Sequence, residues 1–310
     1  MREKRTHSQA AFTLIELSIV LVIIGLIVGG VLVGRDLIKA AEVRAQVSQI
    51  GKFNLAANTF RGKYGYLPGD IPDPDASNFG FAKRGAFPHQ GDGNGIIEGL
   101  INGADQQGGE TVMFWVDLTS ANGMNLNLIE GSFSRAKTSA SYSSSGGSEV
   151  LKPGSPGVDD FLPKAKLGST NYIYAWSGGL TGGDGTNYYT LSGVVYIDEG
   201  SPSANPDLTP NQAYAIDKKM DDGMPQSGTV TTMYRDVNNC GFCYAGGANG
   251  GLSDNNIGGP VTDPANASGE TNSAYTCYDF PDPLHPSLPL TYSIATNGNL
   301  PNCALSFKFQ

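Results

Sequence analysis

The most distinct pattern along the chain is an apolar stretch close to its start. Residues 12–33, FTLIELSIVLVIIGLIVGGVLV, contain a single charged side chain, that of Glu16. As a helix, this stretch extends about 33 Å, which is enough to cross the hydrocarbon layer of a membrane. Residues 1–11 are polar and basic, so we expect this leader to stay in the cytoplasm and the remainder of the chain to be exported.

The helical pattern continues past the apolar stretch. From Arg35 onward, apolar residues recur every three or four positions, which is the spacing of one helical face. The pattern ends near Gly62, ahead of Pro68. We therefore expect one helix over residues 12–62, with a transmembrane first part and a second part that packs on a sheet.

The rest of the chain alternates between turn-rich segments and short apolar runs. Residues 110–118 and a segment that Thr209 caps and Gly223 ends predict two further helices. Aromatic and β-branched runs predict strands at 171–176, 188–197 and 229–233, and alternation at 303–310 predicts an edge strand. These elements predict an α+β fold in three parts, namely a leader (1–11), the long helix (12–62) and an exported domain with an antiparallel sheet (63–310).

Charge and composition narrow the possible functions. The chain has 310 residues, a formal net charge of -9 and 42 glycines. An acidic chain without a basic stripe argues against nucleic-acid binding, which requires neutralisation of phosphates. No nucleophile elbow, phosphate-binding loop or HExxH motif occurs. We therefore expect a protein that is not an enzyme.

All four cysteines lie in the last quarter of the chain, at Cys240, Cys243, Cys277 and Cys303. In an exported domain, an even number of cysteines predicts disulfides, and three pairings are possible. Two alternatives remain open: a redox-active CxxC at 240–243 and a four-cysteine zinc site. The redox pair is disfavoured because glycine-rich sequence surrounds it, and zinc because Cys277 and Cys303 stand far apart.

Two groups of acidic residues are candidate sites. Asp92, Asn94 and Glu98 in GDGNGIIEG place oxygen ligands at a spacing that could surround calcium, although a glycine-rich turn has the same composition. Asp217 and Asp221 lie four residues apart on the predicted helix after Thr209. The neighbouring Lys218 and Lys219 favour a solvated helix surface there over a pair of catalytic carboxylates. We therefore predict a possible calcium site at 92–98 and no other cofactor.

The amino-terminal residues AAFTLIELSIVLVIIGLIVGG resemble the signal of type IV pilins and type II secretion pseudopilins. An ordinary secretory signal differs, because its small residues follow the apolar run, whereas Ala10 and Ala11 precede it. The stretches YGYLPGD, GDGNG and AIDKKMDDGMPQSG also resemble segments of large pilin-like proteins.

The resemblance implies a processing route. Prepilin peptidase would cut the bond between Ala11 and Phe12, and Phe12 would become the methylated first residue of the mature chain. Glu16 would then be the fifth mature residue, which in this family serves in assembly. A buried carboxylate needs a partner, and the Phe12 amine of a neighbouring subunit could supply it. The alternative partner is the amine of the same chain, four residues away.

The resemblance also implies partners, location and function. The partners would be prepilin peptidase, other pilin or pseudopilin subunits and the assembly platform of the bacterial inner membrane. The body would be periplasmic, and the protein would later enter a filament. Because the domain at 63–310 is large, we expect a minor subunit. The alternative is a membrane-anchored exported binding or adhesion module that uses the signal without bulk polymerisation.

Overall fold

A computed structural model describes much of the chain, namely residues 14–84, 91–97, 109–121, 124–125, 128–129, 158–160, 162–168, 170–177, 185–197, 202–205, 207–225, 227–233, 277–279, 291–294, 298, 301 and 303–309. Five predicted site residues lie outside this part of the chain: Ala11, Phe12, Glu98, Cys240 and Cys243. Two compact units are present, Met1–Glu42 and a body that comprises Val43–Gln310.

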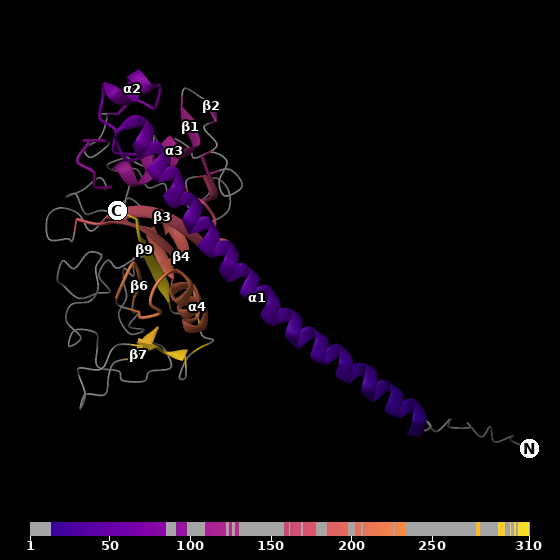
Figure 1. Cartoon of the computed structure of the whole chain (residues 1–310). Helices are drawn as coiled ribbons and strands as arrows, with labels where there is room; N and C mark the ends of the chain where they lie inside the picture. The colour runs from indigo at the N-terminus through magenta and orange to yellow at the C-terminus, as the bar shows by residue number, and fades with distance from the viewer. Residues whose placement is uncertain are drawn as a thin grey trace, which may run out of the picture. The chain divides into compact units, whose positions relative to one another are not determined.

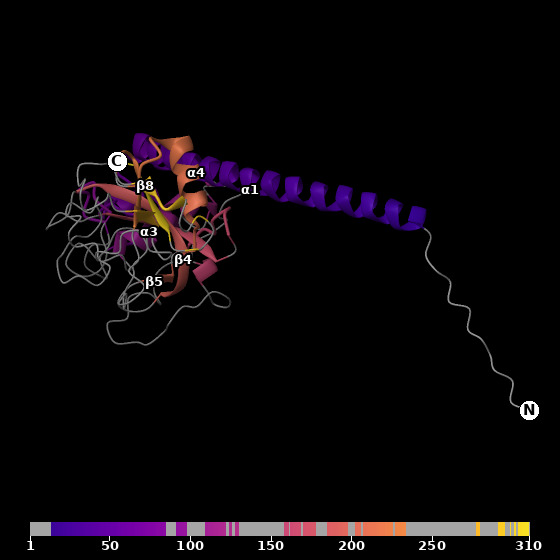
Figure 2. The same ribbon diagram turned by 90° about the horizontal axis from the view of Figure 1, so that it is seen from below.

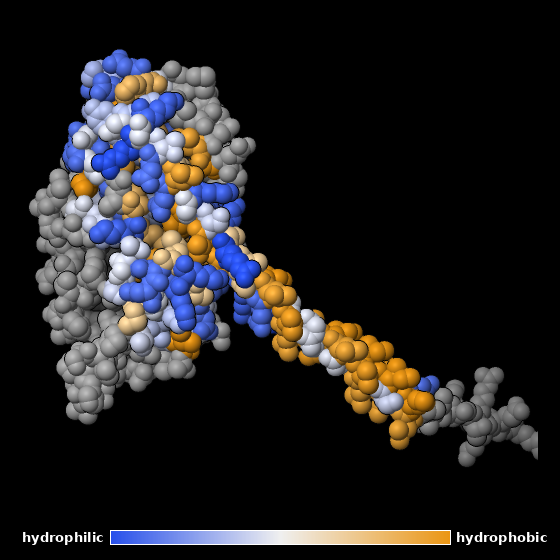
Figure 3. All heavy atoms as spheres, in the orientation of Figure 1, coloured by the Kyte–Doolittle hydropathy of each residue, from blue (hydrophilic) through white to orange (hydrophobic). Residues whose placement is uncertain are grey.

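Helix α1 (Leu14–Tyr64) contains both the apolar stretch and the periodic segment that follows it. It ends two residues beyond the predicted Gly62, because the chain leaves the helix at Gly65, whose φ of 82° suits glycine. Hydrophobic side chains cover the amino-terminal part of α1 in the space-filling view (Figure 3). Within the described residues, α1 is the one helix long and apolar enough to cross a membrane, by length and composition alone.

Within the body, one face of α1 is buried. Its buried apolar residues recur at helical spacing, as the sequence pattern predicts: Val43, Ile50, Phe53, Ala56, Ala57 and Phe60. Phe53 contacts the rings of Trp115 and Tyr189, with centroid distances of 5.0 and 5.9 Å. This aromatic cluster joins α1 to helix α3 (Gly109–Thr119) and to the sheet.

The main sheet is antiparallel and has the order β3-β4-β9-β6, with β5 also paired to β4 (Figure 1). The strands are β3 (Asn171–Ser177), β4 (Asn187–Ile197), β5 (Pro202–Asn205), β6 (Val230–Met233) and β9 (Ala304–Lys308). Two small sheets pair β1 (Ser120–Ala121) with β2 (Met124–Asn125), and β7 (Tyr278–Asp279) with β8 (Thr291–Tyr292). The predicted α+β fold with a long amino-terminal helix is confirmed.

The prediction that the carboxyl-terminal strand lies at an edge is wrong. β9 pairs with β4 through Leu305–Lys308 and with β6 through Ala304–Phe307, so it lies between two strands. Its apolar and polar side chains alternate, but Ala304, Leu305, Ser306 and Phe307 are all buried. Alternation along a strand reports its two faces and not its position in the strand order.

The predicted helix after Thr209 is α4 (Pro210–Met220), which ends three residues before Gly223. Thr209 caps it as expected: its Oγ1 accepts a hydrogen bond from Gln212 N, and Gln212 Oε1 accepts one from Thr209 N. Figures 1 and 2 place α4 and the body part of α1 on the same side of the main sheet. Among the residues that the structure describes, the remaining helices are α2 (Asp75–Phe79) and a 3-10 turn, η2 (Val158–Asp160).

Candidate functional site

The amino-terminal part of α1 exposes a continuous apolar surface. All of its large apolar residues are exposed, namely Leu14, Ile15, Leu17, Ile19–Ile24, Leu26–Val28 and Val31–Val33. A soluble protein rarely exposes so long an apolar surface, so this segment requires a lipid or protein environment. Glu16 lies in the first turn of α1, as the sequence predicts, while the bond between Ala11 and Phe12 lies outside the described residues.

In the body, three carboxylates meet where the turn at 67–72, the loop at 91–97 and the start of α3 come together. One oxygen each from Asp70, Asp92 and Glu110 lies within 4.8 Å of the other two. Asp70 and Glu110 are buried and Asp92 is exposed. Carboxylate oxygens are the donors that calcium prefers, so this set has suitable chemistry for such an ion.

The backbone of the loop at 91–97 wraps around these carboxylates. Asp70 accepts hydrogen bonds from Gly93 N at 2.8 Å and Gly95 N at 3.0 Å. Glu110 Oε1 accepts hydrogen bonds from Gly91 N and Asp92 N. Gly91 has a φ of 93°, and a Cβ there would lie 2.1 Å from the carbonyl oxygen of Ile71, so only glycine fits this approach.

Burial makes the charge on Asp70 costly. It raises the pKa of Asp70 to about 7, the nearby Asp92 carboxylate adds to the rise, and the loop amides oppose it. A cation beside these carboxylates would lower the pKa again, because it stabilises the charged form. The cluster therefore favours either protonation or a positively charged ligand.

The structure changes the set of residues predicted for this site. Asp92 takes part in the cluster, whereas Asn94 bonds within its own loop: its Nδ2 donates to Asp92 Oδ2 and its Oδ1 accepts from Ile96 N. Sequence reasoning missed Asp70 and Glu110. Acidic residues in the LPGD turn and at the start of the 110–118 helix were visible, but nothing local indicates that they meet the GDGNG loop.

A buried ion pair supports the same region. Arg84 Nη2 lies 2.5 Å from Asp117 Oδ2, which also accepts a hydrogen bond from Gly69 N at 2.6 Å. Arg84 donates further bonds to the carbonyl oxygens of Ile71 and Ala82. The pair therefore joins the turn that carries Asp70 to α3, which carries Glu110.

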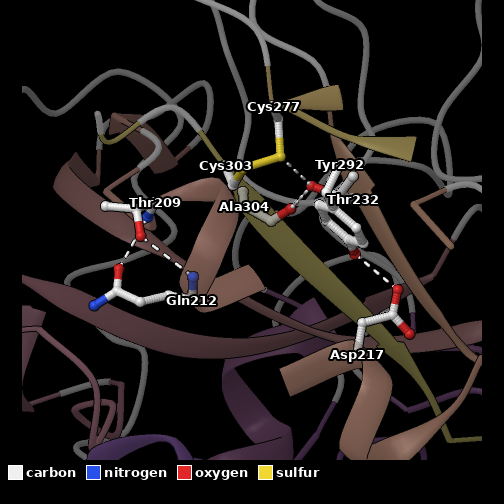
Figure 4. Close-up of a disulfide and its surroundings, with 8 residues drawn as sticks. All are labelled: Thr209, Gln212, Asp217, Thr232, Cys277, Tyr292, Cys303 and Ala304. Carbon is white, nitrogen blue, oxygen red and sulfur yellow. Dashed lines mark hydrogen bonds between the residues drawn. A yellow bond between two sulfur atoms is a disulfide. The ribbon is translucent and has the colours of Figure 1, made fainter. Parts of the chain in front are cut away.

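At the other end of the sheet, Cys277 and Cys303 form a disulfide, with a Cα–Cα distance of 5.1 Å (Figure 4). Thr232 Oγ1 lies 3.1 Å from Cys277 Sγ and donates a hydrogen bond to the carbonyl oxygen of Ala304. A four-cysteine zinc site is incompatible with this bond, because zinc binds thiolates. Of the three pairings that the sequence allows for the four cysteines, this bond is compatible with one, the pairing that joins Cys277 to Cys303.

The expectation that Asp217 belongs to a solvated helix surface is wrong. Asp217 is fully buried, and its carboxylate accepts hydrogen bonds from Tyr292 Oη at 2.8 Å and Gly223 N at 3.2 Å (Figure 4). Burial raises the pKa of Asp217 to about 6, and these donors oppose the rise. Asp221 accepts a hydrogen bond from the backbone amide of Val230 at the start of β6, and Asp222 accepts one from Met224 N in the loop that follows α4. These contacts hold the segment between α4 and β6 in place.

Comparison with known proteins identifies the amino terminus. Residues 6–32 match the model of the prokaryotic N-terminal methylation motif. Searches of curated proteins and of solved structures gave no match. The motif covers residues 6–11 of the leader and the exposed apolar part of α1 as far as Leu32. The chain therefore carries the amino-terminal methylation signal of type IV pilins and pseudopilins.

Proposed function

We propose that the protein is a minor subunit of a type IV pilus or a type II secretion pseudopilus, processed between Ala11 and Phe12 and assembled through α1. The observation that carries the proposal is the methylation motif at 6–32 on a helix whose apolar side chains are exposed. The α+β body on the same helix supports it. The size of the body, residues 63–310, favours a minor subunit over the main repeating one.

Processing would prepare the helix for assembly. Hydrolysis of the peptide bond between Ala11 and Phe12 leaves a cationic amine at Phe12, and methylation keeps its charge. Glu16 would neutralise this amine on a neighbouring subunit within a bundle of apolar helices. Such a pair offsets the desolvation of both charges, whereas either charge alone in that environment is expensive. The partners would be prepilin peptidase, the other subunits and the inner-membrane assembly platform.

Intact-mass measurement of the membrane-purified protein tests the processing step. The expected product begins at Phe12 and carries one added methyl group. Retention of residues 1–11 would contradict the proposal.

The substitution Glu16→Ala tests assembly. The variant should still insert into the membrane but should be absent from sheared filaments. The matched control is Ser18→Ala, which changes another polar side chain of the same helical segment, and this variant should enter filaments normally.

The same two measurements address the alternative function, a membrane-anchored binding module. For such a module, a variant with Glu16→Ala would keep both its location and any ligand binding. Incorporation of the wild-type chain into filaments, lost on this substitution, would exclude it.

We also propose that calcium binds the loop at 91–97 and stabilises the body. The sequence-based set was Asp92, Asn94 and Glu98; the cluster supports Asp92 and adds Asp70 and Glu110 as the residues that would hold the ion. When bound, calcium would supply positive charge among three carboxylates and so relieve their repulsion. The loop also connects to the sheet, because the side chain of Asn187 bonds Ile97 N and the carbonyl oxygen of Gly95.

A further inference from the structure

The small sheet of β7 and β8 is attached to the body on two sides. On one side, Cys277 just before β7 forms the disulfide with Cys303, and Thr232 Oγ1 of β6 lies 3.1 Å from Cys277 Sγ. On the other side, Tyr292 of β8 donates a hydrogen bond of 2.8 Å to the Asp217 carboxylate on α4 (Figure 4). Because the disulfide is covalent, the contact between β8 and α4 is the one that can open.

The contact with α4 involves one face of that helix. The buried ring of Tyr292 meets the ring of Tyr214 edge-to-face, with a centroid distance of 5.9 Å. At the start of α4, Asn211 N donates a hydrogen bond to the carbonyl oxygen of Gly298 in the segment after β8. Asn211, Tyr214 and Asp217 recur every three residues, so they lie on the same side of the helix. Asp217 is the ionisable carboxyl group in this contact.

The surroundings of Asp217 disfavour its ionised form. One oxygen each from Asp217, Asp221 and Asp222 lies within 4.8 Å of the other two. Neither of the ion pairs among the described residues involves Asp217, and the neighbouring Lys218 donates to Tyr214 Oη. β6, which also packs on α4, contains no ionisable residue. Carboxylates this close repel one another, so the closed contact favours one bound proton, in agreement with a pKa of Asp217 that burial raises to about 6.

We propose that Asp217 and Tyr292 form a pH-sensitive latch, which holds β8 on α4 while the carboxyl group is protonated and releases β8 when the group is ionised. Release returns the carboxylate to water and so removes the penalties of burial and repulsion. The disulfide keeps the small sheet tethered beside β9, so the opening is local and reversible. The latch lies within the body and does not rest on the proposed assembly function.

The direction of the pH effect follows from proton binding. In the closed state the pKa of Asp217 is about 6, whereas in the open, solvated state it returns towards its ordinary value of about 4. The closed state is therefore fully favoured below pH 4, and this advantage is lost as the pH rises through 6. Each unit of difference in pKa changes the ratio of open to closed molecules by about tenfold.

Hydrogen–deuterium exchange of the full-length chain in detergent, with EDTA present, tests the latch. After correction for the intrinsic exchange rates, peptides that contain residues 291–294 should be at least about tenfold less protected at pH 7 than at pH 4. At pH 7 their protection should not change in about 1 M urea, because a local opening exposes little surface, whereas the protection of β4 peptides should fall.

A variant and a matched control identify the group that titrates. Asp217→Asn keeps an acceptor for Tyr292 Oη but cannot ionise, so the protection of residues 291–294 should be the same at the two pH values. Asp159→Asn changes an exposed carboxylate that also accepts a hydrogen bond from a tyrosine hydroxyl, that of Tyr172, and it should leave the pH dependence unchanged. The wild-type profile alone decides the matter for a variant that does not fold.

Three results would overturn the latch: equal protection of residues 291–294 at pH 4 and pH 7 in the wild type, the same urea dependence for these residues as for β4, or an unchanged pH dependence in Asp217→Asn. Replacement of EDTA by calcium separates a proton from a metal ion. Protection that calcium restores at pH 7 would show that the three carboxylates bind the ion, and it would also overturn the latch. The proposed assembly function stands or falls separately, on filament incorporation.

Discussion

The guanidinium of Arg84 and the carboxylate of Asp117 form an ion pair of 2.5 Å, with side chains 1% and 0% exposed. The carboxylate also binds the backbone amide of Gly69, so one acidic side chain holds two segments of the chain. Both charges have left water, and their attraction and hydrogen bonds offset that cost only while both are present.

Removing one member of this pair should therefore destabilise the body strongly. We expect Asp117→Ala to lower the free energy of unfolding by about 3–5 kcal/mol, because Arg84 would remain buried and uncompensated. The double variant Arg84→Met/Asp117→Leu should lose less free energy of unfolding than the single variants Arg84→Met and Asp117→Leu lose in total. Urea unfolding of the purified proteins measures this, and an additive double variant would contradict the coupling.

The contact between Asp217 and Tyr292 predicts a pH dependence of stability. Burial raises the pKa of Asp217 to about 6, so the folded state binds its proton more tightly than the unfolded state does. The stability that this proton contributes is fully present below the ordinary pKa near 4 and is lost as the pH rises through 6.

The measurement is the difference in unfolding free energy between wild type and Asp217→Asn, taken at pH 4 and pH 7. This difference should fall by about 1–3 kcal/mol from the lower to the higher pH. Tyr292→Phe removes a donor to the carboxylate, and it should cost more stability at pH 7 than at pH 4. Equal costs at the two pH values would contradict a buried, titrating Asp217.

The proposed calcium site predicts stabilisation by the ion. At a calcium concentration about 100 times the dissociation constant, the free energy of unfolding should rise by about 2.7 kcal/mol. Calorimetric scans with calcium and with EDTA would show it as a higher Tm. The variant Asp92→Asn/Glu110→Gln should lose the shift, while Asp159→Asn, which changes an exposed carboxylate outside the cluster, should keep it. A wild-type Tm that does not respond to calcium would exclude the site.

The disulfide between Cys277 and Cys303 leads to two expectations, one for peptide mapping and one for the free energy of unfolding. Peptide mapping without reduction should recover Cys277 joined to Cys303, and the same logic predicts that any second disulfide joins Cys240 to Cys243. The variant Cys277→Ser/Cys303→Ser should lose about 3–4 kcal/mol, because a sequence separation of 26 residues is then no longer constrained in the unfolded chain. A peptide that joins Cys240 to Cys303 would contradict this pairing.

Two buried glutamines of α1 form hydrogen bonds with the backbone of residues 164–167. Gln46 Oε1 accepts hydrogen bonds from Lys166 N at 2.8 Å and Leu167 N at 3.2 Å, and Gln49 Nε2 donates to the carbonyl oxygen of Lys164. Gln46→Leu would leave these amides without this acceptor and should cost about 1–3 kcal/mol. Ser48→Ala, exposed on the same helix, should cost much less, and equal losses in thermal unfolding would contradict the role of Gln46.

Local pattern predicted the longer helices and strands of this fold, whereas it missed the short elements α2, β1, β2, β5, β7 and β8. β4 has the predicted end at Ile197, α3 differs from prediction by one residue at each end, and Thr209 caps α4. Each of these depends on a few consecutive side chains and on the hydrogen bonds of their own backbone. The place of β9 between β4 and β6 could not be read this way, because strand order depends on partners far apart in the sequence.

The same distinction applies to the sites. The amino-terminal signal could be identified from the sequence alone, because its parts are contiguous. These parts are a basic leader, a small residue before an aromatic one, an early glutamate and a long apolar run. Only the tertiary structure brought Asp70 and Glu110 to Asp92, buried Asp217 against Tyr292 and paired Cys277 with Cys303. Those contacts join residues 18 to 75 positions apart, and packing of the whole body, not any local preference, decides which of them meet.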